Sequence, residues 1–257
     1  MVKARNGLIL SLFALVVALV VTTTSTYAWF AMNSTVTAQN MQISVTADNT
    51  YLVITNNSSD LTDNKFTGTS VSTTSSASAI DRVALLPTKL KAEDTPLVWQ
   101  TAAGTALDNG AALDGDYTDI ASANEVKYVK KFTFYVGLNP DYSAVNATNL
   151  KIKNITVTAA ATNAGSEALR KAVSVCAVCG TNVRNFASAN DGTFTGLNSD
   201  AKFLAATLNA DGTAVQVDIY VYINGDNSNV TSANAAVANA LGGFDVAVEF
   251  AVTPGAA

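Results

Sequence analysis

The two cysteines are the most reactive side chains that the sequence brings close together. They form the motif Cys176-Ala-Val-Cys179 and are the only cysteines in the chain. A redox motif of this spacing normally begins a helix, which lowers the pKa of a thiol, whereas this pair ends the strand-like run SVCAVCGT. Because the N-terminus indicates an exported protein, we predict a disulfide between Cys176 and Cys179 that closes a turn before Gly180. Two free buried thiols are the alternative.

Four aspartates lie in the glycine-rich stretch DNGAALDGDYTD, at Asp108, Asp114, Asp116 and Asp119. Clustered carboxylates on a loop can bind calcium, but this spacing does not match an EF-hand. Aspartate and glycine are also good turn formers, which favours a solvated turn. A calcium site at Asp114, Asp116 and Asp119 is therefore the alternative interpretation, and no other cofactor is expected.

The chain contains no histidine. This excludes the commonest general base, the commonest zinc ligand and every nucleophile that depends on a histidine partner. We therefore expect a protein that is not an enzyme.

The overall charge argues against a nucleic-acid partner. The net charge is −5, and a chain beginning at Trp29 would lose two of the 15 basic side chains and none of the 20 acidic ones, for a net charge of −7. Nucleic-acid binding requires a basic surface. This charge is instead typical of a soluble secreted protein.

The N-terminus has the three parts of a secretory signal peptide. Lys3 and Arg5 precede an apolar run over residues 8–21, and small residues at Thr26 and Ala28 follow. This pattern predicts that residues 1–28 are removed by an export signal peptidase that cleaves between Ala28 and Trp29.

A retained leader is the alternative. No charge occurs between Arg5 and Asp48, so a tilted helix from Leu8 to about Met32 could span a bilayer. The Arg5-Asn6-Gly7 sequence also resembles a prepilin-peptidase site, although Leu12 stands where bacterial pilins carry a glutamate. Only in this case would the protein contact a membrane.

The rest of the chain predicts β-strands that position these groups. Apolar and polar residues alternate over 35–47, 128–138, 215–223 and 244–252, and further strands are expected over 50–55, 80–90, 97–100, 150–159 and 172–178. The alternation slips at Asn154, which a β-bulge or a switch between sheets would explain. Polar loops are expected over 56–79 and 101–125, and short helices over 166–171 and 231–241.

Eight or nine strands with polar loops predict an antiparallel, jelly-roll-like β-sandwich with one or two short helices. We assign the apolar leader to residues 1–28, an N-terminal segment to 29–47 and one sandwich domain to 48–257. The chain is long enough to bury a substantial core.

The N-terminal region resembles the start of the TasA/camelysin family of biofilm-matrix fibre proteins. The resemblance rests on Ala28-Trp29-Phe30 behind an apolar leader and on the positions that follow, Val36, Asn40, Met41 and Ile43. Weaker similarity occurs at ALR over 168–170, at VYINGDN over 221–227 and at the final strand FDVAVEF. The family usually has an acidic residue shortly after a Tyr-Phe or Phe-Phe pair, whereas this chain has Trp29 and then Ala31-Met32-Asn33.

The resemblance implies a secreted subunit that forms a homopolymer at the cell surface or in the extracellular matrix by donor-strand complementation. In such a polymer, the N-terminal segment adds head-to-tail as a strand to the next copy. The expected donor residues are Trp29, Phe30, Val36, Met41, Ile43 and Val45. Residues 29–47 carry no charge, so their insertion would bury no ion.

Three alternatives stay open. Met41, Ile43 and Val45 could pair within their own sheet instead of in a neighbour. The protein could be a membrane-anchored or pilin-like surface subunit that keeps its N-terminal helix. It could also be an adhesive binding module that uses the loops over 56–79 and 101–125.

Overall fold

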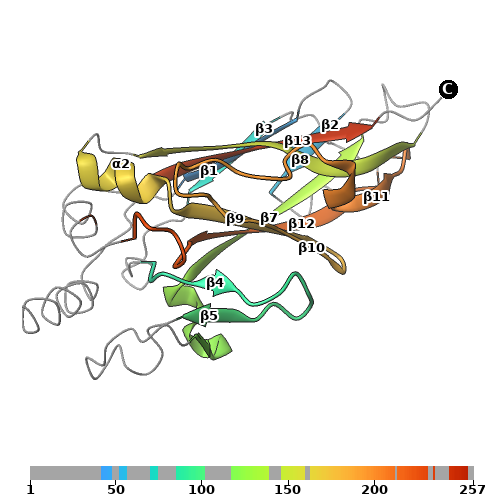
Figure 1. Cartoon of the computed structure of the whole chain (residues 1–257). Helices are drawn as coiled ribbons and strands as arrows, with labels where there is room; N and C mark the ends of the chain where they lie inside the picture. Colours follow the sequence, from blue (N-terminus) through green and yellow to red (C-terminus); the bar gives the residue numbers. More distant parts are fainter. Residues whose placement is uncertain are drawn as a thin grey trace, which may run out of the picture.

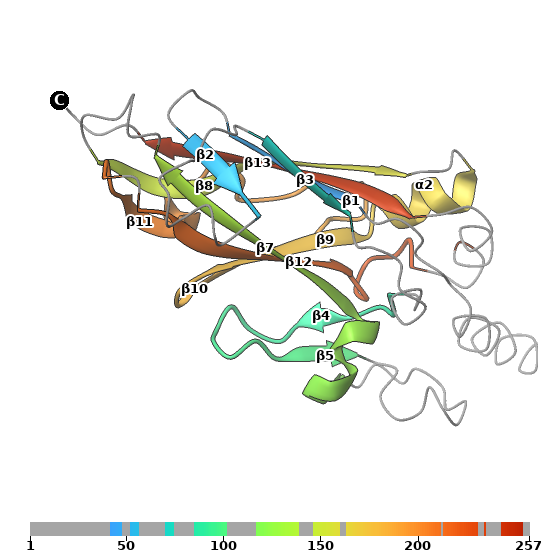
Figure 2. The same ribbon diagram turned by 180° about the vertical axis from the view of Figure 1, so that it is seen from behind.

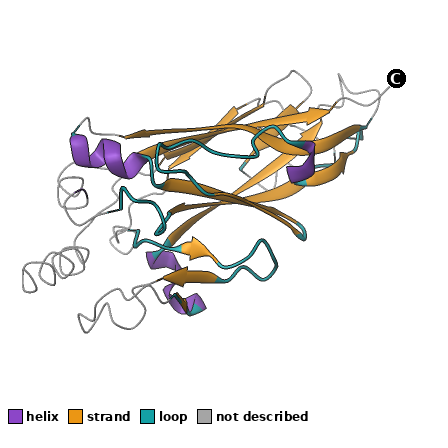
Figure 3. Ribbon diagram, in the orientation of Figure 1, coloured by secondary structure: helices purple, strands orange, loops and turns teal. Residues whose placement is uncertain are grey.

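We describe residues 42–47, 52–56, 70–74, 85–101, 117–138, 146–159, 163–211, 213–230, 234 and 243–253 of a computed structural model of the chain. Strands make up most of these residues (Figure 3). Two sheets pack face to face, and a smaller third sheet lies against the outer face of one of them (Figure 1). The predicted β-sandwich is therefore confirmed.

The first sheet has five strands. Their order across the sheet is β11 (Ala205–Leu208), β8 (Ala147–Ala159), β13 (Phe244–Thr253), β1 (Gln42–Ala47) and β3 (Ser70–Thr74). All pairs in this sheet are antiparallel except β1 with β13, which run parallel. The sheet is therefore mostly antiparallel, as predicted, and the β1–β13 pair is the exception.

The second sheet also has five strands. Their order is β10 (Asn182–Phe186), β9 (Val173–Cys179), β12 (Val215–Ile223), β7 (Val129–Leu138) and β2 (Leu52–Thr55). Every pair in it is antiparallel. The expected strands over 128–138, 172–178 and 215–223 are confirmed as β7, β9 and β12.

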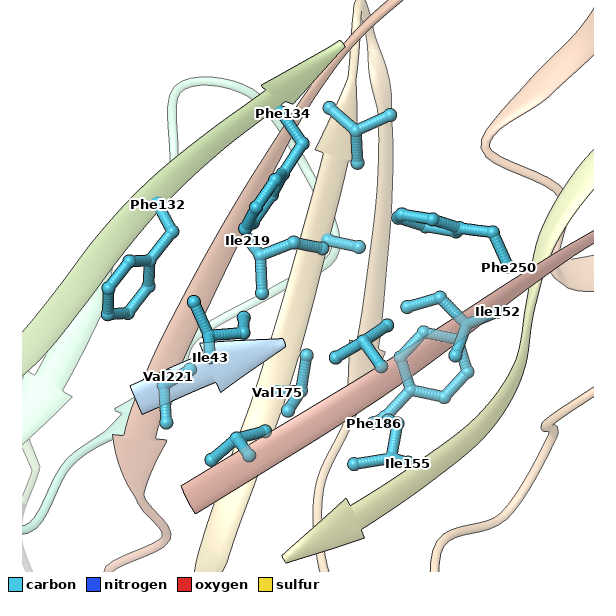
Figure 4. Close-up of a cluster of buried hydrophobic side chains, with 14 of the residues drawn as sticks. Ile43, Phe132, Phe134, Ile152, Ile155, Val175, Phe186, Ile219, Val221 and Phe250 are labelled. Atoms are coloured by element: carbon cyan, nitrogen blue, oxygen red, sulfur yellow. The ribbon is translucent and has the colours of Figure 1, made fainter. Parts of the chain in front are cut away.

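The core lies between these two sheets. Phe134, Ile219 and Phe250 are fully buried in one apolar cluster to which strands of both sheets contribute (Figure 4). The alternation of apolar residues along each strand places one face of each sheet against this cluster.

A β-bulge explains the slip of the alternation in β8. Asn154 pairs with Glu249 and Ile152 pairs with the next residue, Phe250, so Lys153 is an extra residue on β8. Ile152 and Ile155 are consequently both buried. The strand stays in the first sheet on both sides of the bulge, which excludes the switch between sheets.

The third sheet covers part of the second. It consists of β4 (Lys89–Leu90), β5 (Trp99–Thr101) and β6 (Thr118–Asp119), and a 3₁₀ helix over Ser122–Lys127 follows it. Viewed from either side, β4 and β5 lie below the second sheet (Figures 1 and 2). Trp99 is almost fully buried, with its ring centroid 5.0 Å from that of Tyr222 on β12.

Three expectations need correction in this part of the chain. The loop expected over 56–79 contains β3, because the β-branched and small residues of SVSTT pair with β1. In the described residues, the strand expected over 80–90 is reduced to β4, and the loop expected over 101–125 contains β6 and the 3₁₀ helix. The expected strand over 97–100 is β5.

The short helix expected over 166–171 is α2 (Ala164–Arg170). Asn163 caps its N-terminus by accepting a hydrogen bond from the Ser166 amide at 2.8 Å. A second 3₁₀ helix covers Asp200–Lys202. The helix expected over 231–241 lies outside the described residues except for Asn234.

Candidate functional site

The site built around β1 is a slot between two other strands of its own sheet. Gln42 pairs with Asp245 and Ala47 with Phe250 along the parallel ladder to β13. On the other side, Gln42 pairs with Thr74 and Thr46 with Ser70 along the antiparallel ladder to β3. The backbone of β1 is therefore paired on both sides.

Ile43 anchors β1 in the core. Its side chain is fully buried in the same cluster as Phe132, Val221 and Val246 (Figure 4). Burying an isoleucine side chain of this kind contributes about 1.5–3 kcal/mol. The structure describes the side chain of Ile43 in β1, and the burial of this side chain fixes β1 in the slot.

The slot has an apolar inner side and a charged outer side. On β13, Val246, Val248 and Phe250 are buried, whereas Asp245 and Glu249 alternate with them. The Glu249 carboxylate is 3.2 Å from the Lys153 Nζ, which offsets its charge. An incoming strand therefore needs an apolar residue at every second position, and QISVTA meets this condition with Ile43, Val45 and Ala47.

The predicted donor residues divide into two groups. Trp29, Phe30, Val36 and Met41 lie outside the described residues, as does the cleavage junction between Ala28 and Trp29. Ile43 and Val45 lie in β1, where Val45 pairs with Val248 and with Val71. For residues 42–47 the structure therefore has the alternative arrangement, in which the strand pairs within its own sheet.

The predicted disulfide is wrong for this structure. Cys176 and Cys179 are both free and buried on β9. Because they are three residues apart in a strand, they face opposite sides of the second sheet, which is too far for an S–S bond. Cys176 lies in the cluster under the third sheet and Cys179 in the main core, so the alternative of two free thiols holds.

The turn after Cys179 needs no crosslink. Gly180 has a φ of 58° and begins a two-residue connection to β10. A glycine with positive φ at the first central position is typical of a type II′ hairpin turn. The hairpin ladder from Cys179–Asn182 to Val175–Phe186 then holds the turn closed.

Burial keeps both thiols protonated. It raises the pKa of Cys176 to about 12, with a smaller contribution from the charge of Glu93. It also raises the pKa of Cys179. Neither thiol has the lowered pKa that redox chemistry requires.

The predicted calcium ligands lie partly outside the described residues. Asp114 and Asp116 are among those not described. Asp119 is on β6, where its carboxylate accepts hydrogen bonds from the Lys91 Nζ at 2.9 Å and from the Gln100 Nε2 at 2.7 Å. Within the described ranges, no group of three potential metal-ligating side chains comes together.

Comparisons with known proteins assign no identity. No protein-family model, curated protein or solved structure matches the chain. In the part of the chain that the structure describes, no helix has the length and hydropathy needed to cross a membrane. The function must therefore be argued from β1 and the strands around it.

Sequence reasoning predicted the strand over 244–252 that forms one wall of the slot, β13, but it missed the pairing of β13 with β1 and the whole of the other wall, β3. The alternation over 35–47 identified β1, but nothing local indicates that it pairs in parallel with the last strand of the chain. β3 was hidden in a polar, low-complexity stretch, where only Val71 and the adjacent threonines signal a strand. Those β-branched residues were the available clue.

Proposed function

We propose that this protein is a structural subunit of an extracellular filament or matrix fibre, in which copies assemble head-to-tail by exchanging β1. In the assembled form, β1 of one copy occupies the slot between β13 and β3 of the next. The leader over residues 1–28 would direct export, with Ala28 and Trp29 at the cleavage junction.

One observation carries the proposal: β1, which belongs to the N-terminal segment over 29–47, fills a slot between two other strands of its sheet. β1 lies between β13 and β3, and Ile43 is fully buried there. The next strand in sequence, β2, belongs to the other sheet. Among the described strands β3 is paired with β1 alone, so β3 also loses its partner when β1 leaves the sheet, until β1 of another copy fills the slot.

When β1 is exchanged, the contacts that it loses within its own chain are formed again with a neighbouring chain. A second copy supplies the same neutral strand to the same slot, so the ladders and the burial of Ile43 are restored between chains. This is why exchanging an identical element is a low-cost route to association. If the contact is head-to-tail and does not close into a ring, it produces a filament.

A disulfide lock tests this proposal. Ser44 and Ala247 are opposite each other in the β1–β13 ladder. Neighbouring strands lie about 4.8 Å apart, which is within the Cα separation that a disulfide spans. The double variant Ser44→Cys/Ala247→Cys, oxidised as a dilute monomer of the chain beginning at Trp29, should hold β1 in its own slot.

The expected result is that the oxidised chain stays monomeric under conditions in which the reduced double variant and the wild type form filaments. The two single variants, Ser44→Cys and Ala247→Cys, are the matched controls and should assemble normally. Filaments formed by the fully oxidised double variant would contradict the proposal. If the full chain beginning at Met1 instead kept its leader, bound vesicles and stayed unassembled, a membrane-anchored surface protein would be favoured.

A further inference from the structure

The edge of β10 is the second feature of this fold that bears on association. Among the strands that the structure describes, β10 is the outermost of the second sheet and is paired with β9 alone. Edge strands present unpaired N–H and C=O groups to other chains, and natural proteins usually protect them. A filament subunit has a particular need for such protection, because many copies are held close together.

Side chains bond the outward-facing backbone groups of β10. Successive residues of a hairpin strand direct their N–H and C=O alternately toward the partner strand and away from it. The Asn185 amide donates to the Glu93 Oε1 at 3.0 Å, and the Asn185 carbonyl accepts from the Lys202 Nζ at 3.1 Å. Both groups that Asn185 turns outward are therefore satisfied.

Arg184 covers the preceding part of the edge. Its Nη1 donates to the carbonyl of Val183 at 2.8 Å, and its Nε donates to the carbonyl of Phe203 at 3.0 Å. The guanidinium carbon also lies 5.5 Å from the centre of the Phe203 ring. These contacts fix a positive charge at the middle residue of β10.

The three side chains come from different parts of the chain. Glu93 is in the turn between β4 and β5, Arg184 is on β10 itself, and Lys202 ends the second 3₁₀ helix. The Lys202 Nζ is also 3.3 Å from the Glu93 Oε1, so the two charges support each other. The loop between β4 and β5 reaches the β9–β10 hairpin in both views (Figures 1 and 2).

We propose that Glu93, Arg184 and Lys202 form an edge guard that prevents β10 from pairing with β10 of a second copy. The blocked arrangement is a two-fold antiparallel pairing of the two β10 strands. Glu93 and Lys202 occupy the backbone groups that such a pair requires. Arg184, at the centre of the strand, would face its own copy, and like charges directly opposite each other are destabilising.

This inference extends the proposed function, on which its biological role rests. With β10 closed, this edge of the second sheet takes no part in association, which leaves it to the proposed exchange of β1 in the first sheet. The physical claim, that removing the edge guard creates a second self-association surface, holds independently of β1 exchange.

The test uses the oxidised Ser44→Cys/Ala247→Cys chain, in which β1 cannot be exchanged. Into it we would introduce Glu93→Ala, Arg184→Thr and Lys202→Ala, and measure molar mass by light scattering over a range of concentrations. The expected result is a concentration-dependent dimer, because a two-fold contact closes at two copies, while the locked chain with its edge guard intact stays monomeric. The control is Glu93→Gln in the same locked chain. It keeps an acceptor for the Asn185 amide and should remain monomeric.

Hydrogen exchange provides a second readout. In dilute solution, the single variant Glu93→Ala should accelerate exchange of the Asn185 amide by about tenfold, because that amide loses its hydrogen bond to a charged acceptor. On association of the triple variant, the same amide should become protected again.

The inference is overturned if the triple variant is folded and monomeric at every concentration, or if it associates with the Asn185 amide left exposed. Failure of the filament proposal gives a different result. In that case either the wild type does not assemble, or the locked chain with an intact edge guard itself polymerises. In both cases the edge guard is judged by the increase in mass when it is removed.

Discussion

At the scale of single residues, burial suppresses the reactivity of the two cysteine thiols. Cys176 lies under Trp99 and Tyr222, and Cys179 lies in the main core. Burial raises the pKa of both thiols, so neither is a nucleophile near neutral pH. The Cys176-Ala-Val-Cys179 motif is therefore part of the packed interior.

The thiols predict how stability depends on pH. The pKa of Cys176 rises from 9.0 when unfolded to about 12 when folded. Its contribution to stability is therefore complete below about pH 9 and is lost as the pH rises toward about 12. Between about pH 8 and about pH 10, the wild type should lose more unfolding free energy than the double variant Cys176→Ala/Cys179→Ala. Equal losses in urea unfolding at both pH values would contradict this.

Asn227 holds three backbone segments together. Its side chain is almost fully buried, and its Nδ2 donates to the carbonyls of Lys171, Ser188 and Ala189, the shortest at 2.9 Å. The variant Asn227→Ala would remove the donor to the Lys171 carbonyl, whereas the Ser188 carbonyl keeps the Asn224 Nδ2 and the Ala189 carbonyl keeps the Gly192 amide. We expect it to lower the free energy of unfolding by about 2–3 kcal/mol. Asn190→Ala, at an exposed neighbouring position, is the control and should cost clearly less in the same denaturant titration.

At the scale of elements, the strands with strict alternation could be predicted from the sequence, and their partners could not. β12 lies at the predicted residues because Val217, Ile219 and Val221 all face the core. The bulge in β8 could also be predicted from the sequence, since the alternation of apolar residues shifts by one position at Asn154 and a shift of one position requires an extra residue. The parallel pairing of β1 with β13 joins the first and last described strands. No local sequence pattern indicates such a pairing between distant segments.

The third sheet shows a different limit of sequence reasoning. Tyr222 lies at a β12 position whose side chain points away from the main core. It would be expected to reach solvent, yet it is fully buried. The reason is that Trp99 covers it from a segment more than a hundred residues away in sequence. β4, β5 and β6 are each too short to produce a clear periodic pattern.

The third sheet should detach when its anchor is removed. Trp99→Ala removes a side chain that is 1% exposed, and such a truncation typically costs about 3–5 kcal/mol. We expect limited proteolysis to cut first within residues 85–128, before the strands of the two large sheets. Trp99→Phe keeps an aromatic ring there and should stay more resistant. Simultaneous loss of all fragments would instead indicate that the three sheets unfold together.

At the scale of the whole molecule, the two sides of the sandwich have opposite proposed roles in association. On one side, β1 fills a slot with a neutral strand that another copy can also supply. On the other, the edge of β10 is closed by Glu93, Arg184 and Lys202. The first sheet would then carry assembly, and the β10 edge of the second would be kept from it.

The most direct test of β1 exchange is the position of the disulfide in assembled material. The reduced Ser44→Cys/Ala247→Cys chain would be allowed to form filaments, then oxidised, unfolded and separated by mass without reductant. If β1 is exchanged, each bond joins two chains, and a ladder of covalent multimers appears. If the filaments yield only single chains with an internal disulfide, β1 has stayed in its own sheet and the central claim is wrong.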